Sequence, residues 1–171
     1  SDAQRGRVMD SLNRLLDLAH EDSSKVNLLN KISQMHLQAG NFREARKSVS
    51  EALTLAKKLN YRKGIATAYN ILGILDANEG KYSDAFKHHE TALDISEQIN
   101  DKNLASLSYT NMGIVLRIIG NYAEALKNLL TPLKITEELN DKRGIANVYN
   151  NIGEVHKFQG NYDDALKYHN I

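Results

Sequence analysis

The chain has 171 residues, which is enough for one domain of ordinary size. Apolar residues make up 42% of the sequence and charged residues 25%, values typical of soluble globular proteins. The 22 basic and 21 acidic residues give a net charge of +1, so the sequence lacks the clustered positive field that binds nucleic acid or an acidic membrane surface.

Residues 3–21 are the first predicted element, a leading helix. Apolar residues recur there at the spacing of one helical face, at Val8, Met9, Leu12, Leu15, Leu16 and Leu18. We expect this helix to cover the unit that follows it.

Four similar segments follow at a period of 40 residues: GNFREARKSV from Gly40, GKYSDAFKHH from Gly80, GNYAEALKNL from Gly120 and GNYDDALKYH from Gly160. A fixed period of about 20–50 residues indicates stacked structural units. We therefore expect a single domain over 1–171, in which four units occupy 22–60, 61–100, 101–140 and 141–171.

Each unit has the pattern of two helices. In the second unit, apolar stripes at helical spacing lie on both sides of Gly80, first Ile65, Ala68, Tyr69, Leu72 and Leu75, then Tyr82, Ala85, Phe86, Ala92, Leu93 and Ile95, with His89 between them. A hairpin of two such helices cannot bury its apolar stripe alone and must stack on its neighbours.

Glycine and asparagine mark the predicted helix ends. The four glycines of the repeated segments, and Asn60, Asn100 and Asn140 between units, can adopt the left-handed conformation that ends a helix. Asn41, Asn121 and Asn161 each precede an acidic residue by three positions, a pattern that predicts a capped helix start.

The repeat resembles the tetratricopeptide repeat, which has aromatic, Leu-Gly and Ala positions on two helices. The first aromatic position holds Leu29, Tyr69, Tyr109 and Tyr149; the Leu-Gly position holds Ile32-Ser33, Leu72-Gly73, Met112-Gly113 and Ile152-Gly153; the alanine position holds Ala45, Ala85, Ala125 and Ala165. The resemblance covers about residues 23–171 and implies an all-α fold, a right-handed superhelical solenoid of antiparallel helix pairs.

The sequence departs from the family pattern in three ways. Its period is 40 residues instead of 34, which predicts helices about one turn longer; the usual proline after the second helix is missing; and Ser33 replaces a glycine, which weakens close packing. The longer repeat is similar to those of kinesin light chains, Pins-type scaffolds and bacterial signalling proteins. The leading segment resembles the entry segment of bacterial sensor proteins.

The fourth unit ends at Ile171, about halfway along its second predicted helix. We therefore expect the sequence to be part of a longer protein. There is no cysteine, which excludes disulfides and thiolate metal sites but leaves both a cytoplasmic and a bacterial periplasmic location open.

No catalytic, metal or cofactor constellation stands out. We interpret His36, His89, His156 and His169 as packing residues, and the neighbouring His88 and His89 point about 100° apart on a helix. Asp76 occupies a core position and is expected to pair with a neighbouring helix. Pro132 lies inside a predicted helix and should kink it, either as a tolerated bend or as a hinge.

The resemblance implies that the first helices of successive units line a concave surface. On that surface Asn30, Asn70, Thr110 and Asn150 recur at one position, where side-chain amides can bond to the backbone of an extended peptide. Beside them lie the other predicted contact residues, Ile74, Ile114, Arg117, Ile118, Lys157 and Phe158.

These patterns favour a non-catalytic scaffold that binds a protein or peptide in its concave groove, within a larger signalling protein. The alternative is a sensory or dimerisation input region of a bacterial sensor histidine kinase or similar regulator, which allows a homodimer. We expect no nucleic-acid partner and no membrane contact by this segment.

Overall fold

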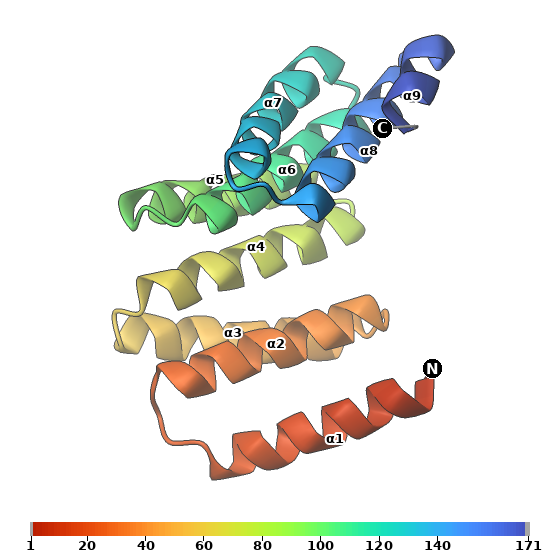
Figure 1. The fold of residues 1–171 in the computed structure, drawn as a ribbon. Helices are drawn as coiled ribbons and strands as arrows, with labels where there is room; N and C mark the ends of the chain where they lie inside the picture. The colour runs from red at the N-terminus through yellow and green to blue at the C-terminus, as the bar shows by residue number, and fades with distance from the viewer. Residues whose placement is uncertain (1, 170–171) are drawn as a thin grey trace.

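A computed structural model describes residues 2–169, which form nine α-helices (Figure 1). The helices are α1 (Asp2–Leu18), α2 (Ser23–Gln38), α3 (Phe42–Lys58), α4 (Arg62–Asn78), α5 (Tyr82–Gln98), α6 (Lys102–Ile118), α7 (Tyr122–Glu138), α8 (Lys142–Phe158) and α9 (Tyr162–His169). The predicted all-α solenoid is confirmed, and the leading helix ends at Leu18, three residues before the predicted end.

The helices pack as antiparallel pairs in sequence order, with α1 at one end of the stack and α8 and α9 at the other (Figure 1). The first helix of each pair contacts the first helix of the next, as α2 does α4, α4 does α6 and α6 does α8. Within the described part of the chain, the second helices α3, α5, α7 and α9 do not contact one another. The first helices therefore line the inner side of the curve.

The predicted helix ends are confirmed. The four glycines of the repeated segments have φ between 76° and 81°, and Asn60, Asn100 and Asn140 have φ between 51° and 55°. Glycine adopts this left-handed region without strain, and asparagine tolerates it better than most residues. Glycine thus makes the turn within each hairpin, and asparagine the turn between hairpins.

The predicted capping by Asn41 and Asn121 is wrong, because neither side chain makes a cap hydrogen bond in the described structure. Their ψ angles of 63° and 70° fall short of the extended backbone of a typical capping residue. Aspartates at other helix starts accept these bonds instead: Asp22 from Ser24 and Lys25, Asp101 from Leu104, and Asp141 from Gly144.

The two helices of a hairpin cross at small residues. The four alanines of the family pattern are buried, and a Cβ atom on Gly73 would lie 2.5 Å from Cε1 of His89. In the first unit the Ser33 hydroxyl donates to the Ala45 carbonyl at 2.7 Å. Serine is therefore accommodated by a hydrogen bond to the helix that it would otherwise crowd.

Helix α7 continues through Pro132 to Glu138, so the proline does not end it. Pro132 is buried, and the carbonyl of Pro132 accepts a hydrogen bond from the Thr136 hydroxyl at 2.9 Å.

We predict that Gly73→Ala lowers the free energy of unfolding by about 1–3 kcal/mol, because the new methyl group overlaps a buried ring that cannot move freely. Urea denaturation measures this change. Gly6→Ala is the control: no atom lies within 4 Å of its added Cβ, so it should be neutral or slightly stabilising. Equal stability of Gly73→Ala and the parent protein would contradict the close crossing.

Candidate functional site

A hollow of about 280 Å³ lies between the first helices α4 and α6. Three of the predicted contact residues, Ile74, Ile114 and Ile118, line it together, and Ile118 is 44% exposed. Ala77, Asn78, Asn111, Val115 and, from the second helix α5, His89 complete the lining. The hollow is therefore apolar at its walls and carries a few polar groups.

Arg117 and Phe158 form a second part of the inner surface, between α6 and α8. The Arg117 guanidinium lies 5.0 Å from the centre of the Phe158 ring, a cation–π arrangement. Phe158 is 55% exposed, and Nε of Arg117 is buried without a hydrogen-bond partner in the described part of the chain. Nearby on α8, Lys157 pairs with Glu154 at 3.3 Å. The structure thus brings together the predicted residues of the third and fourth units.

The repeat position of Asn30, Asn70, Thr110 and Asn150 is not an open surface in the first three units. Asn30 is 3% and Asn70 2% exposed, and each donates to the next first helix: Asn30 to the Gly64 carbonyl at 3.2 Å and Asn70 to the Ser108 hydroxyl at 2.8 Å. Thr110 is buried as well and donates to Ser106 of its own helix. This position faces the neighbouring first helix, so the prediction that these three side chains are exposed to a ligand is wrong.

Asn150 occupies the same repeat position but is exposed. Within residues 2–169 no further first helix packs on α8, so nothing covers the face on which Asn150 lies. Exposure at this position therefore depends on whether another unit follows in the stack.

Asn70 also fixes the orientation of His89. Its Oδ1 lies 2.9 Å from Nδ1 of His89, which must donate, and a neutral ring in this tautomer keeps Nε2 as an acceptor. Burial, and secondarily the nearby His88, lowers the pKa of His89 to about 4, while Asp76 acts in the opposite direction. His89 is therefore neutral at pH 7.

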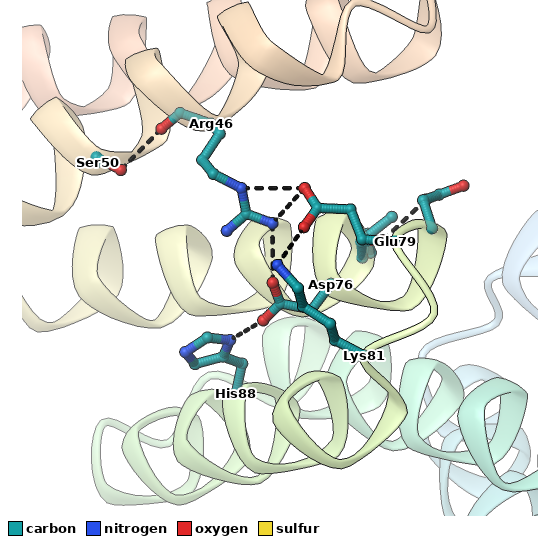
Figure 2. Close-up of polar contacts among 8 residues, drawn as sticks. Arg46, Ser50, Asp76, Glu79, Lys81 and His88 are labelled. Carbon is teal, nitrogen blue, oxygen red and sulfur yellow. Dashed lines mark hydrogen bonds and ion pairs between the residues drawn. The ribbon is translucent and has the colours of Figure 1, made fainter.

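Asp76 pairs with neighbouring helices, as predicted. Its carboxylate bonds to Nη2 of Arg46 on α3 and to Nδ1 of His88 on α5, both at 2.8 Å (Figure 2). Arg46 also pairs with Glu79 at 2.8 Å, and Lys81 pairs with Glu79 at 2.6 Å. The cluster joins the first two hairpins and forms no catalytic arrangement that we recognise.

The histidines do not gather around a common point. His88 bonds to Asp76 and His89 to Asn70, and the ring of His156 stacks on Tyr168 with a centroid distance of 5.3 Å. The side chain of His169 lies outside the described residues. Among the described residues, no group of three or more His, Asp and Glu side chains is placed to hold a metal ion. None of the described helices combines the length and the apolar character needed to cross a bilayer.

His89 and Asn111 are two of the five lining residues that were not among the predicted contact residues. Asn111 is 8% exposed, and its Nδ2 has no hydrogen-bond partner among the described residues. It stands 40 residues after the buried Ile71. The other units hold Lys31 and Asn151 at this position, so a polar residue is usual there and gave no sequence signal.

The tetratricopeptide repeat family model matches the chain in three overlapping stretches, 24–98, 64–138 and 103–170. The chain belongs to the tetratricopeptide repeat family. No curated protein matches the sequence.

Several solved structures share the fold. A Rap protein complexed with Competence and Sporulation Factor has a TM-score of 0.87 at 18% identity, over 98% of this chain and 48% of that one. Aspartyl phosphate phosphatase F from Bacillus subtilis has a TM-score of 0.77 at 19% identity, and the match covers 86% of this chain and 39% of that one. The apo form of RapI has a TM-score of 0.75 at 19% identity, and the match covers 98% of this chain and 47% of that one. The chain spans less than half the length of each.

We predict that Asn70→Ala lowers the free energy of unfolding of this tetratricopeptide repeat protein by about 1–3 kcal/mol, because it leaves Nδ1 of the buried His89 without an acceptor and removes the bond between α4 and the Ser108 hydroxyl. Asn150→Ala, at the same repeat position but exposed, should change it by less than about 0.5 kcal/mol. Urea denaturation of both variants checks the pair, and a similar effect of the two would contradict the bridging role of Asn70.

We also predict that His89 makes the stability pH-dependent. Because its pKa is lowered to about 4 in the folded protein, the unfolded chain binds more protons between that pH and about 6.5. The contribution of the neutral His89 ring to the free energy of unfolding is complete above about pH 6.5 and is lost as the pH falls toward 4. The free energy of unfolding then changes by up to about 1.4 kcal/mol per pH unit. Urea denaturation at pH 7 and pH 4.5 should show a smaller loss in His89→Gln than in the parent protein.

Proposed function

We propose that the chain is a non-catalytic binding module that holds an extended peptide segment of a partner protein on its inner surface. Tetratricopeptide repeats bind proteins and peptides, and the observation that carries the proposal for this chain is the hollow between α4 and α6. Its isoleucines offer partly exposed apolar area on the rigid first helices, which suits the side chains of a bound segment.

The neighbouring Arg117–Phe158 pair extends this surface toward α8. Ile118 and Phe158 are both exposed, and the guanidinium beside them has donors for polar groups of a ligand. We therefore place the bound segment across α4, α6 and α8, with Ile74, Ile114, Ile118 and Phe158 as apolar contacts and Arg117 and Lys157 as polar ones. Asn30, Asn70 and Thr110 support the helices beneath.

The similarity to Rap structures supports a role in signalling. One of them was solved in complex with Competence and Sporulation Factor. We propose that the chain acts within a larger signalling protein, and that binding by the repeats regulates a function located elsewhere. This proposal rests on the fold and not on shared residues, since the identities are below 20%.

The proposal predicts that Ile118→Asp weakens peptide binding at least about tenfold, because a charge then lies against the apolar side chains of the ligand. The probe is a library of random nonapeptides, tethered to beads through their C-termini and screened with the full chain; selected peptides are then titrated in solution. Leu130→Asp is the matched control, since Leu130 is 60% exposed on the second helix α7, outside the hollow.

Equal binding by Ile118→Asp and the parent protein would remove the inner surface as the site. A concentration-dependent dimer that captures no peptide would instead favour the alternative role, an input region that acts through dimerisation. Sedimentation of the free chain over a range of concentrations distinguishes these results.

A further inference from the structure

Among the residues that line the hollow between α4 and α6, one donor and one acceptor have no hydrogen-bond partner within the described residues. Nδ2 of Asn111 is buried and has no hydrogen-bond partner within the described residues. A buried donor without a partner is destabilising, and such groups are rare in native structures. The energetic cost is removed if a ligand supplies the missing acceptor.

His89 supplies the acceptor. Its Nδ1 is committed to Asn70, which leaves Nε2 without a proton in the neutral ring. A Cβ atom on Gly73 would lie 2.5, 2.6 and 2.8 Å from three atoms of the ring, so Gly73 packs over the ring face and not against its edge. The lowered pKa of His89, about 4, keeps this nitrogen an acceptor at neutral pH.

The remaining lining disfavours charged and purely apolar ligand groups. No Asp, Glu, Lys or Arg lies among the described lining residues, and an unpaired charge is costly to bury. A purely apolar group would leave Asn111 unpaired. A trans backbone amide presents its C=O and N–H on opposite sides, whereas a primary carboxamide carries both on one planar group. At about 280 Å³ the hollow is also smaller than most pockets for drug-sized molecules, which suits one side chain.

We propose that this hollow binds the primary carboxamide of a glutamine or asparagine side chain in the bound peptide, with Asn111 donating to its oxygen and Nε2 of His89 accepting from its NH₂ group. The inference rests on the proposed function and makes it more specific. The isoleucines contact the methylene groups of that side chain and exclude water from the two hydrogen bonds. The module then selects peptides by an uncharged polar residue among apolar ones.

The bead library tests this directly, since tethering through the C-terminus removes any terminal carboxamide. We expect the selected peptides to carry Gln or Asn at one fixed position beside apolar residues. In solution, changing that Gln to the isosteric Glu, or to Met, should weaken binding to the parent protein at least about tenfold. This comparison uses the unchanged protein, so it does not depend on whether a variant folds.

A variant of the protein, combined with the peptide variants, gives a double-mutant cycle. Asn111→Leu should weaken the Gln peptide about tenfold and leave the Met peptide unchanged. Asn151→Leu, at the same position one unit later, should alter neither; Asn151 bonds within its own helix, to Asn147, and does not line the hollow. Thermal unfolding by circular dichroism verifies that both variants are folded.

The outcomes separate the two proposals. Peptides captured without any preference for Gln or Asn, or equal affinity of the Gln and Met peptides, would overturn the carboxamide subsite and leave the binding groove in place. Failure of the parent protein to capture any peptide would overturn both. Loss of all binding in Ile118→Asp, together with loss of only the Gln preference in Asn111→Leu, would support both.

Discussion

The close approach of the two helices in each hairpin determines the arrangement of the rest of the molecule. Buried alanines and Gly73 allow the helices to cross without a side chain between them, and the turns at left-handed glycines and asparagines repeat this geometry every 40 residues. Each hairpin leaves an apolar stripe that only a neighbouring hairpin can cover, so the hairpins stack. Because first helices contact one another across units and the described second helices do not, the stack curves with the first helices inside.

Within this stack, Asn70 connects packing to the candidate site. One side-chain amide joins α4 to α6 through Ser108 and holds the ring of His89 from α5. The group that secures the second and third units therefore also determines which nitrogen of His89 is free to accept. A buried polar residue that serves the fold in this way also prepares a surface for a ligand, since the orientation of the acceptor is fixed before binding.

The sequence predicted most of the fold, because the signals for helices and turns are local and occur in four copies. The left-handed residues and the buried alanines were all identifiable from spacing. The site was predicted less well, because exposure depends on what packs against a residue. Asn70 and Asn150 share a repeat position, but only Asn70 lies under another first helix. The caps failed for a similar reason: backbone angles at Asn41 and Asn121 follow the turn geometry and not the residue type.

The hollow has one wall from the second hairpin and one from the third, with Ile74 on the first wall and Ile114 and Ile118 on the other. It therefore lies across an interface between two units of the solenoid. The superhelical twist of a solenoid is the sum of small rotations between successive units. A ligand held by both walls fixes one of these rotations. Such a ligand restricts motion at that interface, and the restriction determines the relative orientation of the two ends of the stack.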